Sequence, residues 1–161
     1  AFVKNKSMYK KVAKKAKVPA QLVAAIHYRE NTSDCLGGKF DSYLHNGDML
    51  GKETVNEPKG IFYPKGQFVR AAQNAIDMKS SYRGRYKLSA TSKDFVGMCS
   101  FALTYNGKHE SKRIWQHSPY VFSGTNIKKK GKYTDDSGYD PNVVDKQVGV
   151  FLLIDKIYTI G

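Results

Sequence analysis

Apolar residues recur every three or four positions along much of this chain, which is the spacing of an α-helix with one buried face. The pattern predicts five helices, over residues 7–16, 19–29, 67–79, 91–105 and 142–158. The second helix has clear limits, because Pro19 suits a first helical turn and the polar run from Glu30 to Asp34 favours a loop. Asn106 and Gly107 are expected to stop the fourth helix.

A different pattern follows the second predicted helix. Phe40 and Leu44 partly alternate with polar residues, and Asn46-Gly47 is a strong turn signal. We therefore expect a small β-hairpin from Phe40 to about Asn56. The stretches 58–66, 82–88 and 118–140 are predicted to be loops or connectors. The fold class is α+β, mainly α, in a single domain over residues 1–161.

Charge is the most distinctive feature of the composition. The chain has 161 residues, with 27 Lys and Arg against 14 Asp and Glu, which gives a net charge of +13. Such a balance favours a polyanionic partner, namely nucleic acid, an anionic membrane or a bacterial cell wall. Two basic clusters stand out, at 10–17 and 128–132, although a cluster of this kind is also typical of an ordinary solvated face. No apolar run is long enough to span a membrane.

The two cysteines and four histidines do not indicate a particular reaction or metal site. Cys35 and Cys99 can form one disulfide or remain two free thiols, and the sequence leaves both alternatives open. The four histidines lack the spacing of zinc ligands, so no metal and no organic cofactor is implied.

Glu30 is the leading catalytic candidate. It comes directly after the apolar helix, where its carboxyl would lie at the edge of the core. Desolvation there would raise its pKa and keep it protonated near neutral pH, as a general acid requires. The alternative is an exposed glutamate at a helix end, paired with Arg29 or a nearby lysine.

Several motifs resemble the lysozyme superfamily. The segment 18–30 resembles the catalytic helix of goose-type lysozymes and lytic transglycosylases. Residues 43–55 look like an "LHNGDPL…TV" signature of phage and bacterial lysozyme-like proteins, and Tyr105-Asn106-Gly107 is similar to their "YNG". Residues 118–133 resemble their "SPYLWS…GKY" segment. The resemblance implies a lysozyme-like fold, with a small β-hairpin after the catalytic helix.

The resemblance also assigns roles to single residues. It places the general acid on Glu30 and sets Tyr105 and Tyr120 along a glycan cleft. Asn31 departs from it, because lytic transglycosylases commonly have Ser directly after the glutamate. The further residues expected to bind substrate are Ser42, Tyr43, His45, Asn106 and Tyr133.

Many glycosidases use a second carboxylate. Asp41 and Asp48 are the catalytic candidates, although Asp48 also suits a role in stabilising the turn, and Asp34 is expected to be a solvated loop residue. Strand alternation leaves two registers open, with either Asp41 and Tyr43 or Ser42 alone facing the substrate. His27 is expected to be a core histidine.

The function expected from these features is that of a lysozyme-like glycoside hydrolase that cleaves peptidoglycan strands. De-N-acetylated peptidoglycan is a candidate substrate, because the expected site is acidic within a basic protein. The alternatives are a lytic transglycosylase acting on the same bond and a non-catalytic cationic module that binds cell wall or nucleic acid. The expected protein is a monomer, has no specific nucleic-acid partner, and is secreted, periplasmic or delivered by a phage.

Overall fold

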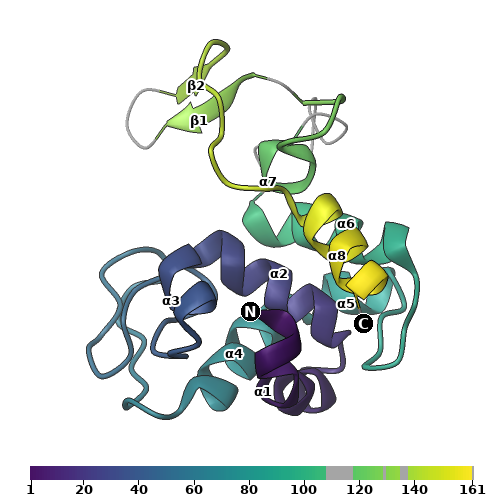
Figure 1. Ribbon diagram of the computed structural model, residues 1–161. Coiled ribbons are helices and arrows are strands. Elements are labelled where there is room, and N and C mark those ends of the chain that lie inside the picture. The colour runs from purple at the N-terminus through teal and green to yellow at the C-terminus, as the bar shows by residue number, and fades with distance from the viewer. Residues whose placement is uncertain (108–117, 129, 135–137, 161) are drawn as a thin grey trace.

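The computed structural model describes residues 1–107, 118–128, 130–134 and 138–160 (Figure 1). The helices are α1 (Phe2–Ala16), α2 (Ala20–Glu30), α3 (Thr32–Gly37), α4 (Phe68–Asp77), α5 (Ser80–Arg85), α6 (Phe95–Asn106), α7 (Pro119–Phe122) and α8 (Val150–Ile160). Strands β1 (Lys132–Thr134) and β2 (Gly138–Asp140) pair antiparallel, with Tyr133 opposite Tyr139. The prediction of a mainly helical fold is confirmed.

Helix α2 lies at the centre of the packing. Eight of its eleven residues are buried, because α1, α3, α6 and α8 all pack against it. A helix that is apolar on all sides is stable only when it is enclosed in this way. The two ends of α2 therefore meet different surroundings: its first turn follows α1, and its last residue, Glu30, lies where α3 begins.

A buried polar network joins α1, α2, α3 and the segment that follows. His27 contacts the hydroxyl of Tyr9 through Nδ1 (3.0 Å) and the carboxylate of Asp34 through Nε2 (2.8 Å). Ser42 also donates to Asp34, at 2.8 Å. Burial lowers the pKa of His27, but the hydrogen bond and charge of Asp34, with a contribution from Cys35, raise it above its ordinary value overall. The prediction of a core histidine is confirmed, whereas Asp34 is buried rather than solvated.

The predicted hairpin is reduced to a single bridge. Ser42 pairs with Met49, flanked by hydrogen bonds from Tyr43 N to Asp48 O (2.8 Å) and from Leu50 N to Asp41 O (2.7 Å). Ser42, Tyr43 and Leu44 are consecutive and all fully buried, which the alternating sides of a regular strand do not allow. The chain from 40 to 56 is therefore mostly loop, closed at its base by this bridge.

Two helix limits also differ from the prediction. Helix α1 begins at Phe2 instead of residue 7, because Phe2 is buried and its ring stacks on Tyr9 at 5.8 Å. Helix α8 begins only at Val150, because residues 145–148 are held in a non-helical conformation by contacts with Arg29. Helices α5 and α7 and the β1–β2 pair lie in stretches predicted to be connectors or loops, and α3 begins within the polar run 30–34 that was predicted to be a loop. Asn31 makes α3 possible, because its side chain accepts from Asp34 N and caps the helix.

Both cysteines are free thiols, so the structure favours that alternative over a disulfide. Cys35 is buried in α3, whereas Cys99 is partly exposed on α6. Within the described ranges, no helix is long and apolar enough to cross a membrane.

The loop after Ser42 packs against the end of α2 through Gly47. Gly47 has φ +71, and a Cβ at this position would collide with the backbone oxygen of Glu30. We expect Gly47→Ala to lower the free energy of unfolding by about 2 kcal/mol or more, because it adds backbone strain to a steric clash. Thermal unfolding measures this. Gly60→Ala is the matched control, since Gly60 also has a positive φ but a Cβ there meets open space. Equal losses of stability in the two variants would contradict the close approach.

Candidate functional site

The candidate site is built around the last residue of α2. Glu30 accepts a hydrogen bond at its Oε1 from the hydroxyl of Tyr120, at 2.9 Å. Tyr120 is buried and lies on α7, 90 residues further along the chain. The sequence order gives no sign of this contact, which exists because α7 packs against α6 and α8 beside the end of α2.

Burial raises the pKa of Glu30 into the neutral range. Desolvation raises the pKa of its carboxyl from 4.5 to about 7, even though part of the residue still contacts solvent. The hydrogen bond from Tyr120 and the nearby charge of Arg29 act in the opposite direction, since both favour the carboxylate. At neutral pH a large fraction of Glu30 is therefore protonated, as was expected from its position after an apolar helix.

Arg29 is committed to other partners, so Glu30 is not an ordinary ion-paired glutamate. The Arg29 guanidinium pairs with Asp145 at 2.8 Å and donates to the backbone oxygen of Gln147 at 3.3 Å. It also lies over the ring of Tyr120, 4.9 Å from the centroid. Among the described residues, no lysine or arginine forms an ion pair with Glu30.

Residues 145–148 form a clamp on the last turn of α2, and the sequence analysis missed it. Gln147 donates from its side-chain amide to the backbone oxygen of Arg29 (3.1 Å) and to the hydroxyl of Thr32 (2.9 Å). Lys132 adds a contact to Asp145 at 3.2 Å. We call Arg29, Asp145 and Gln147 the α2 clamp. The apolar spacing of this stretch predicted a helix. In a helix Asp145 and Gln147 would be ordinary polar surface residues, so their role was not recognised.

The candidate second carboxylates differ sharply in their surroundings. Asp48 accepts hydrogen bonds from Val55 N and Asn56 N, both at 2.9 Å, and from the side-chain amide of Asn56 at 2.7 Å. These contacts hold the loop 48–56 and support the structural role for Asp48. Asp41 is half-buried, and within the described residues its carboxylate has no hydrogen bond or ion pair. Asp41 is therefore the less constrained of the two carboxylates.

Ser42 and Tyr43 do not face an open cleft, in contrast to both registers considered from the sequence. Ser42 is fully buried and donates to Asp34. Tyr43 is fully buried as well, and its hydroxyl accepts from Tyr63 N and donates to Lys52 O. Both side chains point inward because they anchor the loop to the core.

Three of the residues expected to bind substrate line one cavity of about 360 Å³: His45, Tyr105 and Asn106. Its wall also includes Pro58 and Lys79. Tyr105 is buried and donates to Leu44 O at 2.8 Å, so it supports the cavity wall instead of offering a free hydroxyl. Burial and then the charge of Glu30 raise the pKa of Tyr105 well above its usual value. Glu30 itself does not line this cavity.

The ring of His45 is parallel to that of Tyr43, with centroids 5.5 Å apart. Both of its ring nitrogens are buried without a hydrogen-bond partner among the described residues. Burial lowers the pKa of His45, although Asn46 and Asp48 oppose this shift. His45 is therefore a neutral side chain near pH 7. This supports its role in shaping the loop and the cavity.

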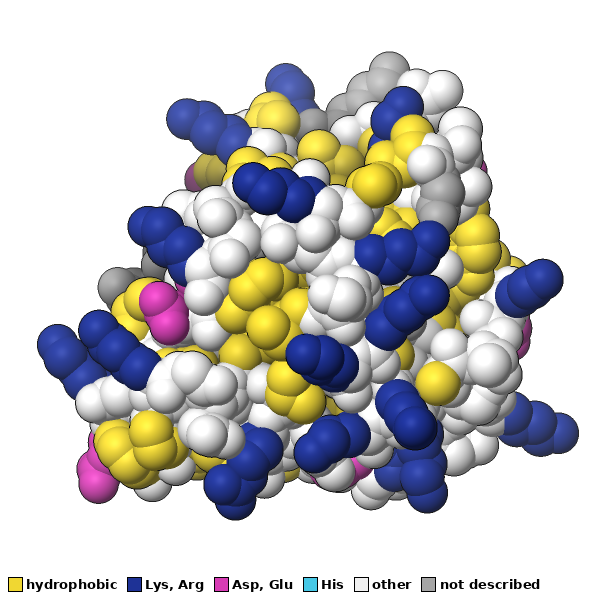
Figure 2. Space-filling view, turned by 60° about the horizontal axis from the view of Figure 1, so that its bottom comes forward, with side chains coloured by type: hydrophobic (Ala, Val, Ile, Leu, Met, Phe, Trp, Pro, Cys, Tyr) yellow, Lys and Arg dark blue, Asp and Glu magenta, His cyan; other side chains and the backbone are white. Residues whose placement is uncertain are grey.

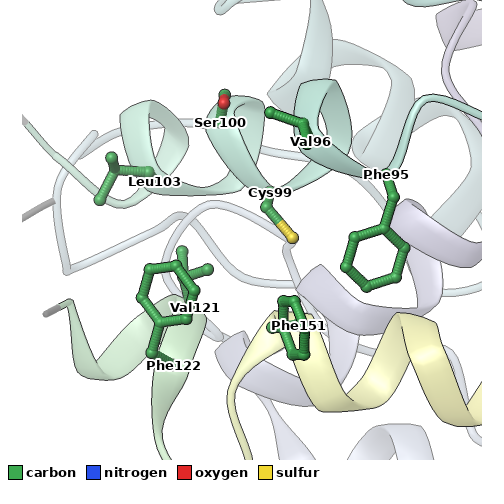
Figure 3. A pocket seen from close by; sticks show the side chains of 8 residues that line it. All are labelled: Phe95, Val96, Cys99, Ser100, Leu103, Val121, Phe122 and Phe151. Atoms are coloured by element: carbon green, nitrogen blue, oxygen red, sulfur yellow. The ribbon is translucent and has the colours of Figure 1, made fainter. Parts of the chain in front are cut away.

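A second hollow lies among three helices, apart from the cavity lined by His45 and Tyr105. It is an apolar groove of about 250 Å³ between α6, α7 and α8, and the side chains of Phe95, Cys99, Leu103, Phe122 and Phe151 converge on it (Figure 3). Burial raises the pKa of the Cys99 thiol to about 12, so it is protonated and a weak nucleophile at neutral pH. The groove offers apolar contacts without acid–base chemistry.

The remaining candidates lie partly or wholly outside the described residues. Tyr133 belongs to β1, but its side chain lies outside the described part. Trp115, whose ring could stack on a sugar, and its neighbours His109 and His117 lie outside the described residues altogether. Within the described ranges, no three His, Cys, Asp or Glu side chains are grouped so as to hold a metal ion.

The two candidate carboxylates should respond differently to amide substitution. Asp48→Asn is expected to cost about 1–3 kcal/mol, because an amide nitrogen cannot accept the hydrogen bonds that a carboxylate oxygen accepts. Asp41→Asn should leave the melting temperature nearly unchanged and lower turnover if Asp41 takes part in the reaction. Thermal unfolding and cell-wall lysis of both variants check this. A larger stability loss in Asp41→Asn would show that the two roles are reversed.

Three comparisons, with protein-family models, with curated proteins and with solved structures, found no match to this chain. The roles of Glu30, Tyr120 and the α2 clamp therefore rest on their geometry and chemistry within the chain itself.

Proposed function

We propose that this protein cleaves the glycan strands of peptidoglycan, with Glu30 as the general acid. The observation that carries the proposal is the enclosed carboxyl of Glu30, whose pKa of about 7 is set by burial and whose position is fixed by Tyr120. A general acid works best when its pKa lies near the working pH. The resemblance of the segments around Glu30, 43–55 and 105–107 to lysozyme-like proteins supports the choice of substrate.

In this mechanism Glu30 gives its proton to the glycosidic oxygen as the bond from that oxygen to the anomeric carbon breaks. Positive charge develops on the sugar ring that keeps the anomeric carbon. In hydrolysis a water molecule adds to that carbon, and its proton returns to a base. The Glu30 carboxylate, left ionised by the first step, is correctly charged to accept it. Tyr120 stabilises that carboxylate through its hydrogen bond.

Hydrolysis and transglycosylation share the first step and differ in the nucleophile. In transglycosylation a hydroxyl of the substrate itself attacks the anomeric carbon, so the product is an anhydro sugar instead of a reducing end. Asn31, which stands where transglycosylases commonly have Ser, uses its side chain to cap α3 and to donate to Gly47 O at 3.2 Å. We favour hydrolysis, and mass spectrometry of digested glycan distinguishes the two products.

The cavity lined by His45, Tyr105 and Asn106 is the proposed place for a sugar next to the scissile bond. It has both apolar walls and polar groups, which suits a pyranose ring with its substituents. A preference for de-N-acetylated strands has weaker support. Of the acidic residues that motivated it, Asp48 already has its carboxylate occupied by Val55 and Asn56.

Glu30→Gln tests the general acid. We expect the rate of lysis to fall about 100-fold or more, because an amide cannot donate the catalytic proton.

The same substitution should raise the free energy of unfolding. In the wild-type protein the free energy of unfolding falls as the pH rises from 4.5 to about 7, because Glu30 ionises more readily in the unfolded chain. The variant avoids this loss, so above pH 7 it should be more stable by up to about 3 kcal/mol.

Wild type and Glu30→Gln should have similar stability at pH 4, where Glu30 is mostly protonated in both the folded and the unfolded wild-type protein. Cell-wall lysis and denaturant unfolding at pH 4 and pH 8 provide the measurements. Retention of more than about a tenth of wild-type lysis would remove Glu30 from the mechanism and favour a non-catalytic binding module.

Tyr120→Phe tests the positioning of Glu30. The hydroxyl of Tyr120 stabilises the ionised carboxylate, so its removal should raise the pKa of Glu30 further. Glu30 then stays protonated to higher pH, and the alkaline limb of the pH–rate profile moves upward. Tyr105→Phe is the control, because the Tyr105 hydroxyl donates to Leu44 O instead of Glu30. An unmoved limb in Tyr120→Phe, or equal shifts in both variants, would contradict the assigned role.

A further inference from the structure

The C-terminal half of α1 carries a dense group of lysines. Lys10, Lys11, Lys14, Lys15 and Lys17 are all exposed, and we call them the α1 lysine face. No acidic residue precedes Glu30 in the chain. In the part of the chain that the structure describes, none of the five forms an ion pair with a carboxylate.

This arrangement helps α1 to fold only in part. Lys14 and Lys15 lie in the last turn, where cations favour the helix dipole. Lys10 and Lys14 are four residues apart, as are Lys11 and Lys15, and like charges at this spacing destabilise a helix. Helix α1 is held mainly by its opposite side, where apolar residues are buried against α2 and α4. The stability of the helix therefore does not account for the whole cluster, in particular for Lys10 and Lys11.

Helix α5 extends the same positive surface. The Arg83 guanidinium donates to the backbone oxygen of Ala16 at 2.7 Å, which brings α5 next to the end of α1. Arg85 and Lys87 follow and are exposed. Figure 2 brings the lower side of the molecule forward, and Lys and Arg side chains are spread over this face with few acidic ones among them.

We propose that the α1 lysine face binds a phosphodiester polymer of the cell wall, of the polyol phosphate type. Lysines one helical turn apart are separated by about 6 Å along the axis, a length that one glycerol phosphate repeat can span. Each ammonium is a point charge suited to a phosphate oxygen, and several such contacts displace the counterions of the polymer. The choice of a wall polymer rests on the proposed function, whereas the binding itself does not require catalysis.

The face is separate from the catalytic candidate. The contact between Tyr9 and His27 shows that α1 runs back along α2, so the lysines extend beside α2 on the solvent side of α1. Glu30 instead accepts its hydrogen bond from Tyr120 on α7. A polymer held on the face can therefore leave Glu30 free for a glycan strand.

The apolar side of α1 argues against a membrane as the ligand. A helix that lies in a bilayer interface inserts its apolar side. In α1 that side is buried in the core, and the large hydrophobic residue exposed on this helix, Val3, lies at its other end. A bilayer would therefore meet the lysines alone.

The experiment measures binding of synthetic poly(glycerol phosphate) to the full chain over a range of salt concentrations. The test variant replaces Lys10, Lys11, Lys14 and Lys15 with Gln. The matched control replaces Lys52, Lys59, Lys65 and Lys93, four exposed lysines outside α1 and α5, with Gln. Both variants lose the same net charge. The test variant should fold about as well as wild type, because the loss of like-charge repulsion offsets the loss of the favourable position of Lys14 and Lys15 in the last turn.

We expect the test variant to weaken binding about tenfold or more at 0.15 M salt and to reduce the slope of log K against log salt by about 2, as loss of roughly three phosphate contacts requires. The control should retain most of the affinity. Equal losses in the two variants would overturn the site, because they would reflect net charge alone.

Two further arms separate the other outcomes. Tighter binding of single-stranded DNA, or of anionic phospholipid vesicles, than of poly(glycerol phosphate) would overturn the assignment to a wall polymer. Glu30→Gln should bind the polymer as wild type does. Polymer binding by a wild-type protein that lacks lysis would leave this inference standing while the proposed function fails.

Discussion

The buried ion pair between Arg29 and Asp145 is the interaction on which the candidate site depends. Their side chains are only 5% and 2% exposed. Removing one partner of such a pair strands the other charge in the core, which typically costs about 3–5 kcal/mol. Here the pair ties residues 145–148 to the last turn of α2, and the Arg29 guanidinium also supports the ring of Tyr120. The position of the Tyr120 hydroxyl follows from both contacts.

The same pair explains the acidity of Glu30. An arginine next to a glutamate would ordinarily pair with it and hold its pKa low. Because Asp145 takes the Arg29 guanidinium, the charge of Arg29 reaches Glu30 only as a minor influence, and burial decides the pKa. Arg29 therefore supports the architecture around Glu30 without neutralising its carboxylate. Arg29 forms a structural ion pair with Asp145, whereas the adjacent Glu30 keeps a carboxyl that Tyr120 holds by a hydrogen bond.

Helix α2 separates two electrostatic regions. Its last turn holds Glu30 among buried tyrosines and the α2 clamp, where charges are few and paired. Its first turn follows α1, whose lysines are exposed and whose carboxylate partners are absent from the described residues. The enclosed acid suits chemistry on a bound sugar, and the open positive face suits attachment to a large anion. The lysines lie on the solvent side of α1, whereas Glu30 meets Tyr120 of α7.

The sequence alone determined what depends on neighbours along the chain. The apolar run before Glu30 predicted both a helix and a desolvated carboxyl, and the central location of His27 followed from the same run. The tertiary structure decided which distant groups meet. Tyr120 and Asp145 reach α2 from about 90 and 116 residues away, and no local pattern encodes such contacts.

The same distinction explains why two predicted elements, the helix over 142–149 and the strand over 42–44, do not form. Residues 142–149 have helical spacing, yet the hydrogen bonds that Asp145 and Gln147 form with α2 hold this stretch out of a helix. Residues 42–44 alternate like a strand, yet the core takes all three side chains. Periodicity reports what one segment prefers in isolation. Burial and pairing with a distant segment override that preference wherever they are worth more free energy.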